Sequence, residues 1–117
     1  MGKKYTLDGI LNLCNGNGKF MNEFLSLFIE TTPDYMQEAI KAATSGNWGE
    51  VTSILHKLKP TVEMFAMEIT PFLKNTHEQA RDRIDTDQIP GKLETINAFF
   101  TEVLVDLKKD LEQYPKE

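Results

Sequence analysis

Residues 51–65 read VTSILHKLKPTVEMF, and this stretch decides the fold. Its apolar residues recur every three or four positions, at Val51, Ile54, Leu55, Leu58, Val62 and Phe65. This spacing places them along one stripe of an α-helix, because a strand would bring every second residue to one face. Asn47 and Glu50 form a capping box before the stripe, and Gly46 can end the preceding helix. The stretch therefore predicts an amphipathic helix with a defined start.

A longer helix is predicted before this stretch. Its apolar stripe begins at Phe20 and ends near Ser45–Gly46. Thr32–Pro33 lies in the middle, where Thr32 could cap a new helix or the first helix could continue with a kink. The uninterrupted three-and-four spacing favours one continuous helix.

Two more helices are predicted after this stretch. Thr70–Pro71 resembles a cap and a first helical position, although the helix could begin a turn earlier, and the pattern fades over residues 82–87. Ile89-Pro90-Gly91 restarts the chain, and a last apolar stripe follows from Leu93 to Leu111 and is ended by Pro115. No stretch alternates with the period of a strand, and no internal repeat is visible.

The N-terminal part adds one short element. Tyr5–Leu13 is amphipathic, and the loop Asn15–Gly18 separates it from the next helix. Four long amphipathic helices with short connections predict an all-α fold, an antiparallel four-helix bundle with a short additional N-terminal helix. Residues 1–117 are expected to form one domain, because 117 residues is a typical domain length.

Composition excludes several classes of function. The chain has 13 Lys and Arg against 18 Asp and Glu, a formal net charge of −5, which disfavours nucleic-acid binding. No apolar run reaches the ~20 residues of a membrane-spanning helix. The one cysteine, Cys14, allows neither an internal disulfide nor a zinc site with two cysteines. A cytoplasmic location is therefore expected. The chain is also expected to be a monomer without a metal or cofactor of its own.

His56 is the candidate reactive residue. It follows Leu55 by one position and so points about 100° away from the buried stripe. The residues on its own side are Thr52, Lys59, Pro60 and Glu63. A neutral imidazole is a good nucleophile near neutral pH, and the charge of Lys59 suits a group that is negative once transferred, such as a phosphoryl group.

The residues around His56 resemble a known signalling motif. The run His56-Lys57-Leu58-Lys59-Pro60-Thr61 is similar to the phosphorylation motif of histidine-containing phosphotransfer (HPt) domains, in which Leu and Lys follow the histidine by two and three positions. The resemblance extends to the loop Asn15–Gly18, the Phe-rich segment 24–33 that ends in a proline, and the Gly-Asn-Trp break at 46–48. Pro60 departs from the commonest form of the motif, in which glycine follows the lysine.

The resemblance implies a phosphorelay function. His56 would be the phosphoacceptor, and Lys59 would stabilise the phosphoryl charge. The partners would be a sensor histidine kinase and a response-regulator receiver domain, with the receiver supplying Mg²⁺. Because nothing in the chain resembles an ATP site, the protein is expected to be a phosphocarrier rather than a self-contained enzyme. The residues expected to contact the partner are Thr52, Lys57, Pro60, Glu63, Met64 and Met67.

Some alternatives stay open at this point. Met64 and Met67 could fill the core instead of a docking surface, because thioethers suit both. His77, the other histidine, has no ligand at metal-binding spacing, and a structural or surface role is predicted for it. The domain could also bind receivers without moving phosphate. A cofactor-binding bundle is disfavoured, because no inward Glu and Glu-x-x-His set is visible.

Overall fold

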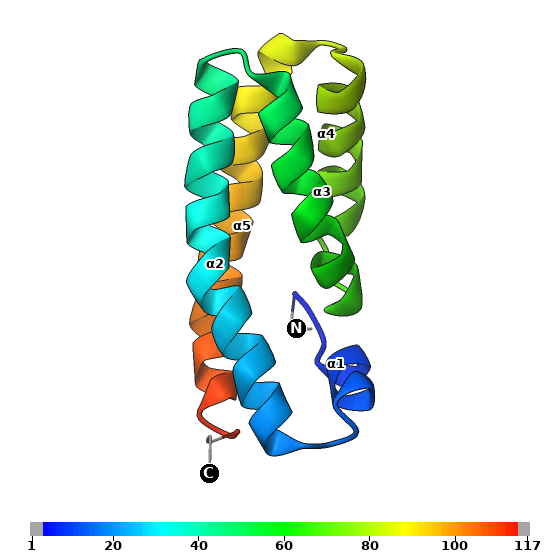
Figure 1. Cartoon of the computed structure of the whole chain (residues 1–117), viewed down its shortest axis with the longest axis vertical. Helices are drawn as coiled ribbons and strands as arrows, with labels where there is room; N and C mark the ends of the chain where they lie inside the picture. Colours follow the sequence, from blue (N-terminus) through cyan, green and yellow to red (C-terminus); the bar gives the residue numbers. More distant parts are fainter. Residues whose placement is uncertain (1–3, 115–117) are drawn as a thin grey trace.

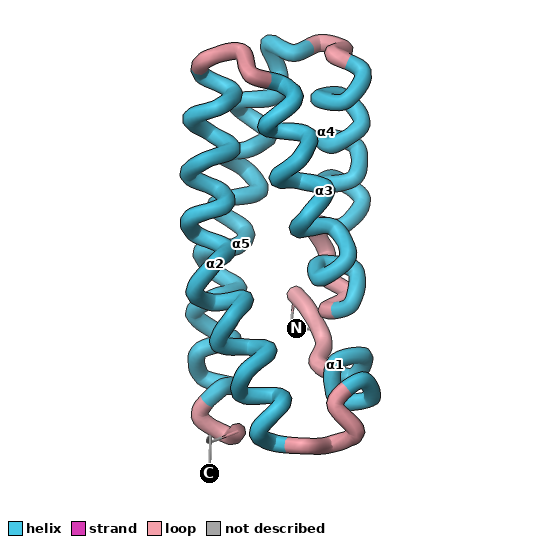
Figure 2. Tube along the Cα trace, viewed as in Figure 1, coloured by secondary structure: helices cyan, strands magenta, loops and turns pink. Residues whose placement is uncertain are grey.

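The computed structural model describes residues 4–114, which are helical almost throughout (Figure 2). In chain order the α-helices are α1 (Asp8–Leu13), α2 (Gly18–Thr44), α3 (Trp48–Met64), α4 (Thr70–Asp82) and α5 (Ile89–Leu111), with a 3₁₀ turn, η1 (Thr86–Gln88), before α5. No strand occurs between residues 4 and 114, so the all-α prediction is confirmed. Pro115, expected to end the last helix, lies outside the described residues. None of these helices is long and apolar enough to cross a membrane.

Successive long helices run in alternating directions, as the colours in Figure 1 show. α2 packs against α3 and α5, and α4 packs against the same two helices. α3 and α4 have 17 and 13 residues, against 27 and 23 for α2 and α5. The short helix α1 lies below the lower ends of α3 and α4 in Figure 1. It therefore covers the part of α2 and α5 that the shorter helices leave.

The N-terminal segment is joined to the end of α3 by a close backbone contact. The Thr6 amide donates a hydrogen bond to the carbonyl oxygen of Phe65, with an N–O distance of 2.7 Å. Gly9 of α1 lies against the last turn of α3, where a Cβ atom would stand 2.9 Å from the carbonyl oxygen of Met64. Only glycine allows this approach without moving the backbone.

Phe65, at the end of α3, is the centre of the aromatic core and is fully buried. Its ring centroid lies 6.1 Å from those of Tyr5 and Phe24 and 5.1 Å from that of Phe28. Phe28 also meets Phe100 of α5, at 6.1 Å between centroids. Tilted and edge-on rings are the favoured aromatic geometries. One cluster therefore joins the N-terminal segment, α2, α3 and α5.

The helix boundaries near residue 47 agree with the sequence, whereas the start of α4 differs. Gly46 has a φ of +73°, and the Asn47 side chain accepts a hydrogen bond from the Glu50 amide at 3.2 Å. The predicted glycine stop and asparagine cap are thus confirmed. For α4 the predicted cap, Thr70, is wrong by one residue. The cap is Ile69, whose side chain has no oxygen to accept the bond, and Thr70 is the first helical residue.

Two prolines lie inside helices. Pro33 is within α2, which is assigned as one helix from Gly18 to Thr44, so the favoured single helix is confirmed. Pro60 is within α3, which continues for four more residues to Met64. Each proline lacks the N–H that would bond four residues back, and tertiary packing offsets this loss.

Candidate functional site

His56 is exposed in the middle of α3, outside the buried stripe of that helix. The residue before it, Leu55, is fully buried, and so is Val51 one turn earlier. Adjacent residues on a helix diverge by about 100°, so burial of Leu55 turns the imidazole outward. The ring nitrogens of His56 are therefore open to a partner, as the stripe predicts.

His77 of α4 lies beside His56. The two ring centroids are 5.9 Å apart and the ring planes differ by 30°. Unlike His56, His77 is buried, with 8% of its surface exposed. This pair cannot be predicted when each helix is considered by itself, because its two members come from different helices. A signal was present, because Met67, in the loop between α3 and α4, is 11 residues after His56 and 10 before His77, so an antiparallel hairpin brings the two histidines level.

The pKa of His77 is lowered from its ordinary value, chiefly because the ring is buried. The positive charge of Lys59 and the neighbouring His56 lower this pKa further, as does Arg81, while Glu78 acts in the opposite direction. A positive charge nearby disfavours a positive charge on the imidazole of His77. His77 is therefore held in its neutral form at neutral pH.

Lys59 is the cation of α3 that faces this pair. It is half-buried, and within residues 4–114 it has no hydrogen-bond or ion-pair partner. Lys57, two positions earlier, is exposed and lies over the ring of Tyr35 on α2, 5.8 Å from the centroid. The two lysines thus lie on different sides of His56, and the charge of Lys59 is available to an anion.

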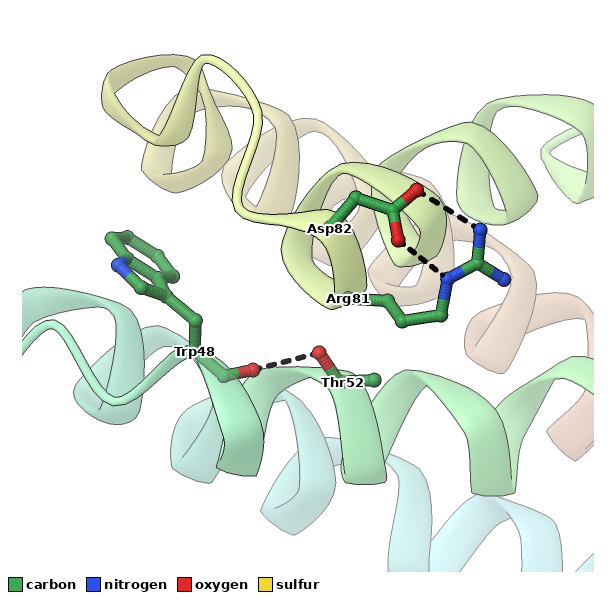
Figure 3. Close-up of polar contacts among 4 residues, drawn as sticks. All are labelled: Trp48, Thr52, Arg81 and Asp82. Carbon is green, nitrogen blue, oxygen red and sulfur yellow. Dashed lines mark hydrogen bonds and ion pairs between the residues drawn. The ribbon is translucent and has the colours of Figure 1, made fainter.

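Two of the acidic residues near the histidine pair, Glu63 and Asp82, are bound to other cations. Glu63 pairs with Lys74 of α4 at 2.6 Å, and this contact lowers the pKa of the Glu63 carboxyl. Asp82 accepts two hydrogen bonds from Arg81, at 2.9 and 3.0 Å, which lower the pKa of Asp82 (Figure 3). Each of these two carboxylates is thus paired with a cation other than Lys59, although the charge of Lys59 also lowers the pKa of Glu63 further.

Thr52 and Pro60, two predicted contact residues, lie one turn before and one turn after His56. The Thr52 hydroxyl donates to the carbonyl oxygen of Trp48 at 2.7 Å and is half-buried (Figure 3). Pro60 is exposed. Pro60 therefore presents its ring to solvent near His56, whereas the hydroxyl of Thr52 is already used inside the helix.

The two methionines predicted as docking residues do not form an exposed surface. Met67 is only 3% exposed and packs in the core, so the expected exposed position is wrong for this residue. Met64 is half-buried and also packs against the core. The reason is α1, which covers the end of α3 at Gly9. Sequence periodicity within α3 could not show that cover.

An apolar groove runs between α2 and α3 on the other side of His56. It has a volume of about 190 Å³ and is lined by Phe24, Leu27, Phe28, Thr31, Tyr35, Lys57, Leu58 and Thr61. Leu27 at its rim is 62% exposed, and the apolar surface continues to Phe20 and Leu13, which are 54% and 61% exposed. Contiguous exposed apolar surface of this kind marks an interaction site.

A larger hollow of about 400 Å³ opens between α4 and the start of α5, but it is polar. Its cation, Lys92, already bonds Gln79 and the side-chain oxygen of Asn75. Among residues 4–114, no three His, Cys, Asp or Glu side chains are placed to hold one metal ion. The region around His56 is therefore the stronger candidate site.

In a comparison with known proteins, no family model, curated protein or solved structure matches the chain. The function is therefore inferred from the residues and their geometry.

Proposed function

We propose that this chain is a histidine phosphotransfer protein that carries a phosphoryl group on His56 between receiver domains. Its four long helices would then form the antiparallel four-helix bundle of that class, with α1 as the additional helix. One observation carries the proposal: His56 is exposed between an apolar groove and the unpaired cation Lys59. A surface histidine without a role would not require an apolar groove on one side and an unpaired lysine on the other.

The transfer is a displacement at phosphorus. A ring nitrogen of His56 attacks the phosphorus of an aspartyl phosphate on the receiver, the N–P bond forms, and the P–O bond to aspartate breaks. The aspartate leaves as a carboxylate, and the remaining N–H proton of the ring passes to solvent. Lys59 stabilises the phosphoryl charge, because the attraction between its ammonium group and the phosphoryl oxygens increases as negative charge develops on them. The receiver supplies Mg²⁺.

The groove between α2 and α3 is the docking surface in this proposal. A receiver that covers His56 from the α2 side would bury Leu27 and the ring of Tyr35. Lys57 at the groove edge adds a positive charge, which attracts the acidic pocket of a receiver. Apolar area then supplies affinity, and the lysine supplies orientation.

Transfer of label tests the proposal. Receiver domains from the same genome are phosphorylated with labelled acetyl phosphate and mixed with the wild-type protein. We expect acid-labile label on the wild-type chain and none on His56→Gln. Thr101→Gln, an exposed position on α5, introduces the same side chain away from the site and is expected to be labelled like the wild type.

Two results would speak against the relay. Undiminished labelling of His56→Gln would remove His56 as the acceptor. If no receiver labels the wild type but one of them binds both the wild type and His56→Gln equally, the protein is a binding module that moves no phosphate. The groove between α2 and α3 is the observation that supports a binding module, because His56 is not among the residues that line it.

A further inference from the structure

The second imidazole beside His56 has no role in the transfer step as written. His77 is buried on α4, its ring centroid is 5.9 Å from that of His56, and the rings are tilted by 30°. A buried polar side chain needs a partner. The hydrogen bonds among residues 4–114 include none made by the His77 ring, which lies beside the exposed ring of His56. In that part of the chain the Thr32 hydroxyl is the one side-chain atom buried without a partner, so the His77 nitrogens reach solvent, from which a proton can come.

We propose that His77 is a positioning residue that takes up a proton when His56 is phosphorylated and then donates a hydrogen bond to the phosphoryl group. The inference rests on the proposed phosphoacceptor role of His56. The proton comes from a hydronium ion of the solvent: its O–H bond breaks as the N–H bond of His77 forms, water is released, and no bond to carbon or phosphorus changes. The imidazolium so formed and Lys59 hold the phosphoryl group from two helices, α4 and α3.

The charges around His77 explain why the ring gains a proton only after His56 has received a phosphoryl group. Before transfer, burial and the cations Lys59 and Arg81 keep the pKa of His77 low. A phosphoryl group adds about −1.5 to −2 charges at neutral pH. At the range of two adjacent rings, Coulomb attraction raises the proton affinity of His77 about tenfold or more. The added charge thus reverses the sign of the local field.

The groups facing His77 come from α3 and from its own helix. His56 and Lys59 act from α3, and Arg81 acts from α4 itself. Two carboxylates of α4 act in the opposite sense, Glu78 and Asp82, the latter already paired with Arg81.

The cation Lys92 of α5 bonds to α4. It binds Asn75 and Gln79, which lie two residues to either side of His77 and so on the far face of α4. Lys92 is thus directed away from the histidine pair. The environment of His77 therefore changes chiefly through whatever His56 carries.

Chemical phosphorylation tests the inference without any receiver. Phosphoramidate transfers its phosphoryl group to exposed histidines and releases ammonia, and mass spectrometry confirms the product. The ring nitrogens of His77 are then titrated by ¹H–¹⁵N NMR. We expect the titration midpoint of His77 to lie about one pH unit or more higher in the phosphorylated protein than in the unmodified protein. An unchanged or lowered midpoint overturns the inference, and so does a His56 that phosphoramidate does not label.

The variants separate a positioning role from a structural one. His77→Gln keeps a hydrogen-bond donor but cannot titrate. The lifetime of the phosphohistidine is measured in the wild type and in His77→Gln at each pH. We expect the ratio of the two lifetimes to change several-fold between pH 6 and pH 8, since only the wild type gains the proton. A merely structural His77 would give a flat ratio, which contradicts the inference.

Failure of this inference is distinguishable from failure of the relay. If receivers label His56 but the His77 midpoint does not move, the positioning role is wrong and the relay stands. If the midpoint rises in the chemically phosphorylated protein but no receiver transfers its phosphate, the pair responds to a phosphoryl group and the relay is wrong.

Discussion

The two sides of His56 differ in chemistry although one helix, α3, supplies both. Toward α2 the surface is an apolar groove, with Leu27 exposed and Lys57 over the ring of Tyr35. Toward α4 the surface is polar, with Lys59 half-buried and His77 beside the reactive ring. A step of one residue along the helix turns about 100°, so neighbouring positions serve different surfaces.

In the proposed function this difference would separate binding from chemistry. The groove offers buried apolar area to a partner, whereas the α4 side offers positive charge to an anion. A partner that docks on the groove leaves the space between α3 and α4 free for the group that is transferred. Each side can therefore be changed without the other.

The largest expected effect comes from removing the support beneath the groove. Phe65→Ala deletes a fully buried ring that contacts Phe24 and Phe28, two residues of the groove. We expect the free energy of unfolding to fall by about 3–5 kcal/mol. Urea denaturation measures it. Phe20→Ala, which removes a ring that is 54% exposed, is the control and should cost far less. Equal losses would show that Phe65 does not anchor the core.

The next effect concerns the charge on the α4 side. We expect Lys59→Ala to slow phosphoryl transfer about tenfold or more, because a hydrogen bond to a charged group is worth about 1.5–3 kcal/mol. The fold should not change, since Lys59 has no partner within residues 4–114. Rapid-quench kinetics measure the rate, and Lys59→Arg should retain most of it. A rate equal to that of the wild type would make the lysine incidental.

A smaller effect is expected at the groove rim. Leu27→Asp places a charge on a residue that is 62% exposed and should weaken receiver binding by about 1–2 kcal/mol while leaving stability nearly unchanged. Val105→Asp on α5, at 52% exposure, is the matched control. Isothermal titration calorimetry compares the two variants. Equal affinities of both for the receiver would place the docking surface elsewhere.

The smallest effect is the pH dependence of stability. The pKa of folded His77 is lowered, so the unfolded chain binds the extra proton more readily. Stability is complete above the pKa of an unfolded histidine, about 6.5, and falls as pH decreases below that value. In His77→Gln this part of the decrease should disappear. Unfolding curves at several pH values measure it, and parallel profiles would contradict the lowered pKa.

Much of the fold could be predicted because it depends on local spacing. The stripe from Val51 to Phe65 set the buried face of α3, and Gly46 and Asn47 ended one helix and began the next. The same reasoning predicted an exposed His56. These features need only the period of a helix and the chemistry of its ends.

The site depended on contacts between helices, and there the sequence was less informative. His77 was interpreted within its own helix, and its place beside His56 follows from the length of the α3–α4 loop. Met67 was a candidate either for the docking surface or for the core, and it is buried in that loop. Neither result can be obtained from the period of a single helix, because packing between elements determines both.

The most direct test of the central claim is to locate the transferred phosphoryl group. The wild-type protein is mixed with a phosphorylated receiver, digested at alkaline pH and sequenced by tandem mass spectrometry. The account predicts one modified residue, His56, with Lys59 unmodified in the same peptide. A phosphoryl group found on His77, or on neither histidine, would contradict it.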